Sequence, residues 1–213
     1  MRRKLIMVAL AAMLPIGFMA TIGSGVAAAK GTTTFDGNIS CNLQGTVKLS
    51  PAINLTTPVT VPVKVTAKLT NDDCIGLDGT STTQNGETII SSTESLSYTI
   101  PPSSPPKPGC VALASGGSEP IPASTIKWKG TSKITSTVLG ASTATITTGS
   151  PNSVLAVTGN VTSGWSTPPT ATYSISLGIN TATVAAGCDS KKGLSKFAVN
   201  DLGGDNLEIG PAF

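Results

Sequence analysis

Apolar and polar residues alternate along much of the chain after residue 30. In the clearest stretch, from Val59 to Leu69, an apolar residue occupies every second position, and Thr, Lys or Pro fills the positions between. This period of two predicts a strand with one face in a core and the other in water. Pro62 cannot donate a ladder hydrogen bond, so we expect the strand to begin at a sheet edge or to contain a bulge there.

Shorter segments with the same pattern recur, separated by Gly, Pro, Asn and Ser turns. Strands are expected at Ile39 to Leu49, Glu87 to Ser92, Leu96 to Ile100, Ile126 to Trp128, Ile134 to Leu139, Val154 to Val161, Tyr173 to Ile179, Phe197 to Val199 and Leu207 to Ile209. Strands at this spacing predict an all-β fold, an antiparallel, Greek-key-like β-sandwich, rather than a parallel α/β sheet. At most a short helix is expected, near residues 182–187.

The N-terminus has the features of a cleaved signal peptide. A basic segment, Met1 to Lys4, precedes an apolar run from Leu5 to Ala20, and small residues follow at Ala27 to Ala29. We therefore expect residues 1–29 to be removed and the mature protein to be secreted, soluble or loosely held at the cell envelope. A membrane anchor is the alternative, but Pro and Gly interrupt the apolar run, so no stable membrane insertion is expected after cleavage.

Residues 30–213 are expected to form a single β-sandwich domain. A mature chain of this length fits one β domain. The proline-rich stretch from Pro101 to Pro108 could be read as a linker between two domains. We interpret it as a stiff loop within one domain, because neither half of the chain alone supplies both faces of a good core.

Charge argues against a nucleic-acid partner. The chain has 14 Lys and Arg residues against 11 Asp and Glu, but Arg2, Arg3 and Lys4 belong to the expected signal peptide. The mature chain then carries 11 basic and 11 acidic residues, and no Arg. Nucleic-acid binding needs a basic face to neutralise phosphates, and this composition does not provide one.

Four cysteines, Cys41, Cys74, Cys110 and Cys188, follow the expected signal peptide. In an exported protein an even number of cysteines predicts a disulfide framework, and four allow three connectivities. A metal site is not expected, because the chain has no His and no pair of cysteines separated by two residues.

A hairpin between the first two strands favours one of these connectivities. Pairing Leu49 with Val59 would place Cys41 opposite Ala67, and a longer loop that pairs Leu49 with Val63 would place Cys41 opposite Asn71. The longer loop brings Cys74 within a short turn of Cys41, at the separation that a disulfide needs. Cys41–Cys74 and Cys110–Cys188 are therefore preferred. The two other connectivities, Cys41–Cys188 with Cys74–Cys110 and Cys41–Cys110 with Cys74–Cys188, remain open.

Three segments together resemble a known group of proteins: Cys41 to Pro51, Ile126 to Ile134, and Gly187-Cys188 with Lys192 to Phe197. The chain resembles exported β-rich proteins of high-GC Gram-positive bacteria, which are described only as hypothetical secreted proteins. The resemblance spans most of the mature chain and implies export and a β fold. Because that group has no established activity, the resemblance carries over no functional residue.

Catalysis is not expected. Without His, neither a Ser-His-Asp nor a Cys-His arrangement can form, and the cysteines are assigned to disulfides. A carboxylate-pair hydrolase remains an alternative, and it requires two acids that face each other across a cleft. Most acidic residues instead stand in turns beside Gly or Asn, where turn formation explains them. No cofactor is expected.

Two acidic turns are candidates for calcium binding: Asn71 to Asp73 with Asp78, and Asp201 to Asn206. Calcium favours several oxygen ligands from one flexible loop. Neither segment matches an EF-hand loop, and ordinary surface turns explain both more simply.

Trp165 is the candidate for a ligand platform. It stands in a loop, Ser163 to Pro169, which could present the ring to a sugar or a cell-wall polysaccharide. The alternative, that the ring folds back to cap the core, is favoured because large apolar side chains are usually buried. Trp128 shares strand phase with Ile126 and is expected in the core. The sequence thus predicts an exported, non-catalytic β-sandwich with a structural or ligand-binding role, with a carbohydrate-binding module using Trp165 as the alternative.

Overall fold

The computed structural model describes residues 34–35, 37–76, 83–84, 87–131, 133–165, 171–200, 202 and 206–211. The expected signal peptide lies outside these residues. Among the helices of this part of the chain, none is both long and apolar enough to span a membrane.

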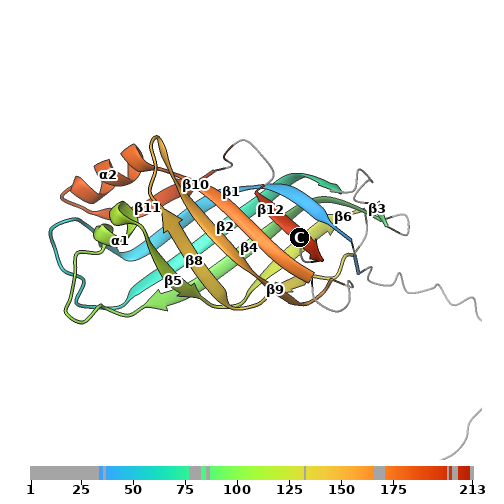
Figure 1. Ribbon diagram of the computed structural model, residues 1–213, viewed down its shortest axis with the longest axis horizontal. Coiled ribbons are helices and arrows are strands. Elements are labelled where there is room, and N and C mark those ends of the chain that lie inside the picture. The colour runs from blue at the N-terminus through green and yellow to red at the C-terminus, as the bar shows by residue number, and fades with distance from the viewer. Residues whose placement is uncertain are drawn as a thin grey trace, which may run out of the picture.

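Strands make up most of the described chain (Figure 1), which confirms the predicted all-β antiparallel fold. The elements are β1 (Ile39–Ile53), β2 (Val63–Gly76), β3 (Thr83–Gln84), β4 (Glu87–Ile100), α1 (Cys110–Ser115), β5 (Gly117–Ile121), β6 (Ser124–Gly130), β7 (Thr137–Leu139), β8 (Ser142–Thr147), β9 (Asn152–Ser163), β10 (Ala171–Asn180), α2 (Thr181–Asp189), β11 (Leu194–Val199) and β12 (Leu207–Pro211). The six-residue helix α1 was not expected, whereas the helix expected near residues 182–187 is α2. Its N-cap Asn180 accepts a hydrogen bond from the backbone N–H of Thr183.

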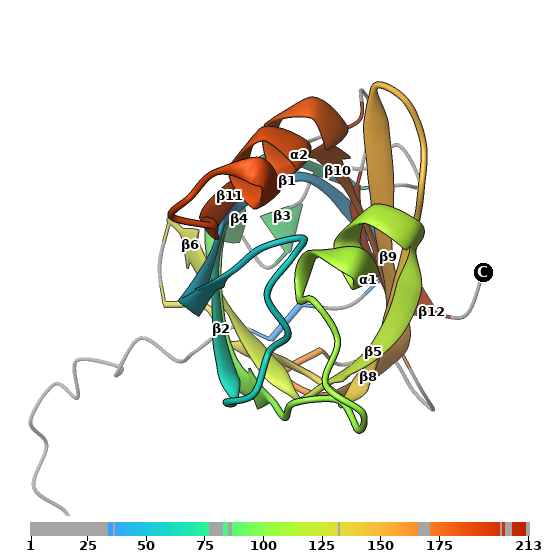
Figure 2. The ribbon, with the colours of Figure 1, turned by 90° about the vertical axis from the view of Figure 1, so that its left-hand side faces the viewer.

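The strands form one continuous sheet that curves around a single core. In order they are β10, β12, β1, β2, β4, β6, β7 and β9, and β9 pairs again with β10, so the sheet closes on itself. The two layers expected of a sandwich are therefore continuous with each other. Figure 2 looks along this closed sheet and shows α1 at the end that faces the viewer.

At that end two neighbouring parts of the sheet separate. The residues Glu94 and Ser95 of β4 still pair with β6, but among the described strands Leu96 to Ile100 pair with β2 alone. On the other side of the gap, β5 pairs with β8, which pairs with β9. Among the described strands no pairing joins β4 to β5. The sheet is thus closed at one end and parted at the other.

The inward-facing residues divide into two halves, which we call the packed half and the cavity half. The packed half lies at the closed end and contains fully buried aliphatic side chains together with three aromatic rings: Leu43, Leu139, Leu207, Ile209, Phe35, Trp128 and Trp165. The ring centroids of Trp128 and Trp165 lie 5.8 Å apart, and those of Phe35 and Trp165 lie 6.3 Å apart. These are ordinary separations for packed aromatic pairs.

The expected hairpin register was wrong, although the disulfide that it suggested forms. Leu49 pairs with Val65, two residues beyond the longer of the two registers considered. The strand expected from Val59 begins only at Val63, because Pro58 and Pro62 cannot donate to the ladder, and Val61 is 51% exposed. A bulge between Ser40 and Asn42 then brings Cys41 to Cys74.

Both preferred disulfides are present. Cys41–Cys74 joins neighbouring strands β1 and β2 with a Cα separation of 4.1 Å, and Cys110–Cys188 joins α1 to α2 with a separation of 6.0 Å. The first lies at the packed half, and the second at the parted end of the sheet. Disulfides persist in oxidising compartments, so this framework fits a protein that works outside the reducing cytosol.

Candidate ligand-binding cavity

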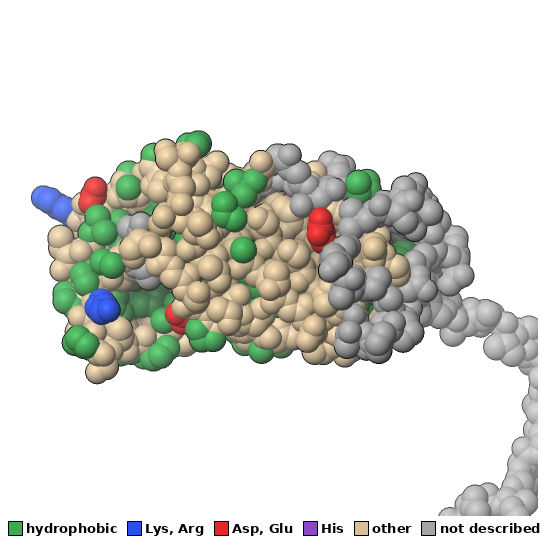
Figure 3. All heavy atoms as spheres, viewed as in Figure 1, with side chains coloured by type: hydrophobic (Ala, Val, Ile, Leu, Met, Phe, Trp, Pro, Cys, Tyr) green, Lys and Arg blue, Asp and Glu red, His purple; other side chains and the backbone are tan. Residues whose placement is uncertain are grey.

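A cavity of about 660 Å³ occupies the cavity half of the core. Its size falls in the range of small-molecule binding sites. Figure 3 shows hydrophobic side chains gathered around a hollow at the end of the molecule where α1 and β5 lie. Its deep wall is made by inward-facing residues of the long strands: Val47, Leu49, Val63, Val65, Ala67, Leu69, Leu96, Leu155, Val157, Ile175, Leu177, Ile179, Phe197 and Val199.

The alternation of the strands explains why this wall is apolar. On β2, Val63, Val65, Ala67 and Leu69 line the cavity, while the intervening Lys64 and Lys68 are exposed on the outer face. On β8 the small residue Ala144 points inward, and Thr143 is exposed. The inward-facing side chains of both strands therefore line the cavity and do not fill it.

Glu94 is the deepest acidic group of the cavity. It lies on the inner face of β4, between Ser92 of the packed half and Leu96, and only 5% of its surface is exposed. Ser124 Oγ donates a 2.5 Å hydrogen bond to Glu94 Oε1, whereas Oε2 has no hydrogen-bond partner among the described residues. Burial raises the pKa of Glu94, and the hydrogen bond from Ser124 opposes this in part.

Tyr98 and Glu119 lie nearer the parted end. Tyr98 is on the same face of β4 as Glu94, and Glu119 is on β5, across the gap. Burial, followed by the nearby Glu119 carboxylate, raises the pKa of Tyr98 to about 12, so its hydroxyl stays protonated at neutral pH. These two side chains give the cavity a polar rim.

The two carboxyl groups of the cavity stand on different strands, Glu94 on β4 and Glu119 on β5. Glu119 raises the pKa of Tyr98, whereas Glu94 Oε1 accepts a hydrogen bond from Ser124. A pair of acids that cleaves a glycosidic bond must instead face each other across that bond.

A cap covers part of the cavity mouth. It consists of residues 54–62, the proline-rich residues 101–109, and α1. The backbone N–H of Val59 donates to the carbonyl of Lys107 at 2.9 Å, and that of Cys110 donates to the carbonyl of Asn54 at 3.2 Å. A Cβ on Gly109 would lie 2.7 Å from Ile53, so only glycine allows the two segments this close approach. The proline-rich stretch thus serves as a stiff cap.

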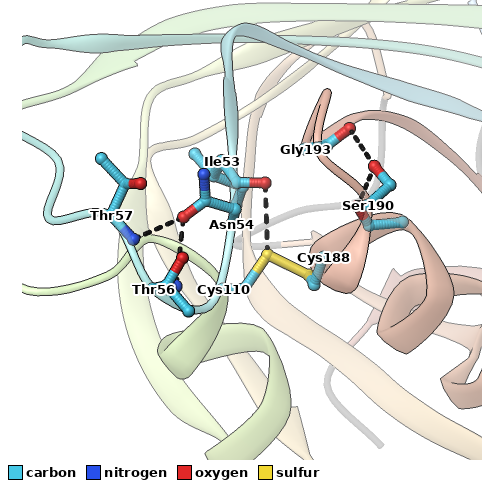
Figure 4. The surroundings of a disulfide bond; sticks show 9 residues. Ile53, Asn54, Thr56, Thr57, Cys110, Cys188, Ser190 and Gly193 are labelled. Atoms are coloured by element: carbon cyan, nitrogen blue, oxygen red, sulfur yellow. Dashed lines mark hydrogen bonds between the residues drawn. A yellow bond between two sulfur atoms is a disulfide. The ribbon is translucent and has the colours of Figure 1, made fainter.

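The Cys110–Cys188 disulfide attaches the cap to α2 (Figure 4). Cys110 Sγ lies 3.4 Å from the carbonyl oxygen of Ile53, a contact without a shared proton because the oxidised sulfur carries none. Asn54 Oδ1 accepts the N–H groups of Thr56 at 3.1 Å and Thr57 at 2.6 Å, which orders the start of the loop. The cap is therefore held from both sides.

Trp165 lies away from this cavity, in the packed half. Its side chain is 8% exposed, and its Nε1 donates to the carbonyl of Gly37 at 2.9 Å. A ring that packs against Phe35 and Trp128 offers no free face for a sugar. Trp128 is in the core as expected, and its Nε1 donates to Thr137 Oγ1 at 2.8 Å.

The two acidic turns considered for calcium fall mostly outside the described side chains. Two of their described members, Asn71 and Asn206, serve the core instead. Asn71 is fully buried, and its amide donates to Ser92 Oγ. Asn206 pairs its side-chain amide with both backbone groups of Leu43, donating to the carbonyl at 2.7 Å. It thereby links β12 to β1.

Comparison with family models, with curated proteins and with solved structures finds no match for this chain. The cavity and Glu94 were not among the residues that the sequence singled out. One signal was available for Glu94, since it stands two positions before Leu96 in the alternation that continues to Tyr98 and Ile100. That phase places a carboxyl group on an apolar face, where an ionisable group is rare unless it is paired.

Proposed function

We propose that this protein is an exported, non-catalytic binding protein that holds an apolar small molecule in the cavity half of its core. The observation that carries the proposal is the cavity of about 660 Å³ with its apolar wall. Protein interiors are packed to crystal density and leave few voids larger than a water molecule. An apolar space of this size loses packing contacts that a purely structural protein would keep, and a bound ligand restores them.

Access for the ligand is supported by the separation of β4 from β5. The unpaired edge of β4, from Leu96 to Ile100, faces this gap, and its inward side chains are only partly buried. A molecule can pass between the two strands without breaking a ladder hydrogen bond. The cap, tied down by Cys110–Cys188, narrows the mouth and retains the occupant.

A catalytic role is less well supported. The two carboxyl groups of the cavity have different neighbours: Ser124 binds Glu94, and Glu119 acts on Tyr98. A carbohydrate-binding role through Trp165 would need a free ring face, and the ring packs in the core. A wall of aliphatic side chains suits a hydrocarbon better than a sugar.

Filling the cavity tests the proposal. Ala144→Trp places a large ring in the space, and Thr143→Trp makes the same kind of change at the next residue of β8, on the exposed face. Titration with an apolar naphthylamine dye should show saturable binding to the unmodified protein. Affinity should fall about tenfold or more in Ala144→Trp, because the new ring occupies space that the dye needs, and should stay unchanged in Thr143→Trp. Equal affinities for the two variants would contradict the proposal.

Export is a separate part of the proposal and has its own test. It rests on the sequence features of residues 1–29 and on the disulfides, which favour an oxidising compartment. N-terminal analysis of the protein recovered from the culture medium or the cell envelope should show a chain that begins at or near Lys30. Recovery of the full-length chain from the membrane fraction would contradict it.

A further inference from the structure

We infer that Glu94 is the specificity group of the cavity and that it binds the hydroxyl head of an otherwise apolar ligand, such as a long-chain alcohol. This inference rests on the proposed function and names the chemical class of the occupant. Its basis is the position of one carboxyl group, which lies at the deep end of an apolar cavity with one oxygen hydrogen-bonded and the other free.

The free oxygen is the unusual feature. A buried polar atom without a hydrogen-bond partner costs free energy, so most such atoms are paired in folded proteins. Glu94 is 95% buried and has one partner, Ser124 Oγ, which binds Oε1 and leaves Oε2 unpaired. A ligand atom in the cavity can supply the missing hydrogen bond.

Lack of a partner alone does not mark a ligand site, because Asn71 Oδ1 and Ser40 Oγ are also unpaired. Those two atoms belong to residues that do not line the cavity, so no ligand can reach them there. Glu94 combines an unpaired oxygen with a place in the cavity wall. No other residue among the described ones has both properties.

The surroundings of Glu94 favour a neutral head over a charged one. On the neighbouring strands, Leu69 and Ile126 flank it, and Lys68 and Lys127 are exposed on the outer face. Tyr173 is a second titratable group near Glu94, because the Glu94 carboxylate helps to raise the pKa of Tyr173. The Tyr173 hydroxyl donates to the carbonyl of Gly140 at 3.0 Å. Among the described residues no cation lies at this depth, so a carboxylate head would stand unpaired beside the carboxyl group of Glu94.

A hydroxyl suits Glu94 in either protonation state. When Glu94 is ionised, Oε2 accepts a hydrogen bond from the hydroxyl, and when Glu94 is protonated, Oε2 donates one to it. Burial raises the pKa of Glu94, so the protonated state is favoured more here than for an exposed glutamate. An alkane chain behind the hydroxyl would then lie along Leu96, Leu177 and Phe197 toward the mouth.

Competition against the naphthylamine dye with dodecanol and dodecane measures the preference for a hydroxyl head. Dodecanol should bind about tenfold more tightly than dodecane, as one added hydrogen bond to a buried group predicts. Dodecanoate should bind less tightly than dodecanol at neutral pH. If dodecane binds as tightly as dodecanol, the inference fails but the proposed function stands. If neither ligand displaces the dye, both fail.

Two variants test whether Glu94 causes the preference for dodecanol over dodecane. Glu94→Leu keeps the size of the side chain but removes its polar atoms, so it should lose the preference for dodecanol while still binding dodecane. Glu119→Leu makes the same change at the other acidic residue of the cavity and should keep the preference. In the unmodified protein, the carboxyl resonance of Glu94 should shift on addition of dodecanol but not of dodecane. A preference that survives Glu94→Leu, or a carboxyl resonance that does not move, would overturn the inference.

Discussion

The packed half and the cavity half are built from the same long strands, yet they are filled differently. In the packed half, Leu43, Leu207 and Ile209 are fully buried, and Trp128 and Trp165 satisfy their indole N–H groups within the core. In the cavity half, the same alternation exposes Leu96 and Ile100 to an open space. Apolar patterning makes an inner face, but closure of the sheet decides whether that face is packed.

Removal of each disulfide should give the largest change in stability, and it should affect the packed half and the cavity half differently. In the chain-entropy model, each closes a loop whose loss costs about 4 kcal/mol in the free energy of unfolding. Replacing Cys41 and Cys74 by Ala should therefore destabilise the protein but leave dye binding in the folded fraction unchanged. Replacing Cys110 and Cys188 should destabilise it similarly and also speed dye release, because the cap loses its attachment to α2. If the dye leaves both variants equally slowly, the attachment of the cap to α2 does not help to retain the ligand.

Leucine truncation should show the difference in packing. Leu43→Ala removes a fully buried side chain of the packed half and should lower the free energy of unfolding by about 3 kcal/mol. Leu96→Ala removes a half-buried side chain that already faces the cavity, and it should cost only about 1 kcal/mol. Urea unfolding of both variants measures the two values. Similar losses would show that the two halves are equally well packed.

A hydrogen bond of the packed half gives a smaller effect. Thr137→Val removes the acceptor of Trp128 Nε1 and should cost about 1 to 2 kcal/mol, because it leaves a buried donor unpaired. Thr143→Val is the matched control, since Thr143 is exposed, and it should change stability by less than about 0.5 kcal/mol. Neither variant should change dye binding, and a loss of binding in Thr137→Val would show that the two halves are coupled.

The last effect concerns pH. Burial raises the pKa of Glu94 above 4.5 in the folded protein, so the folded state holds this proton more tightly than the unfolded chain. Its contribution to stability is present below about pH 4.5 and is lost as the pH rises through the folded pKa. Glu94→Gln should flatten this part of the stability profile.

Ser124→Ala provides the complementary variant for the pH profile. It removes the hydrogen bond that lowers the pKa of Glu94, so the loss of stability should extend to higher pH. Thermal unfolding of both variants at several pH values measures the slopes. An unchanged slope in Glu94→Gln would contradict the assignment to this carboxyl group.

The local structure of this protein follows from its sequence more readily than its long-range structure. Alternation identified the inner faces of β2, β6 and β10, and the spacing of Cys41 and Cys74 pointed to the right disulfide. The register was missed because Pro58 and Pro62 lengthen the loop, and a bulge at Cys41 compensates. Strands β5 and β8 were missed because Thr and Ser dominate β8, and Pro120 interrupts β5.

The cavity could not be predicted from the strand pattern. Its walls come from strands far apart in the sequence, and its volume depends on the separation of β4 from β5, which alternation does not encode. Glu94 was open to prediction in part, since its phase relative to Leu96 and Tyr98 places it inward. That it lies beside a cavity rather than a packed core depends on the same long-range arrangement.

Methyl resonances of the protein, followed during titration with dodecanol, test the central claim most directly. The account predicts shifts at cavity-half methyl groups such as those of Val65, Leu96 and Leu177, and none at packed-half methyl groups such as those of Leu43, Leu139 and Ile209. Shifts restricted to exposed residues such as Val61 and Ile75, or no shift at saturating dodecanol, would contradict a ligand inside the sheet.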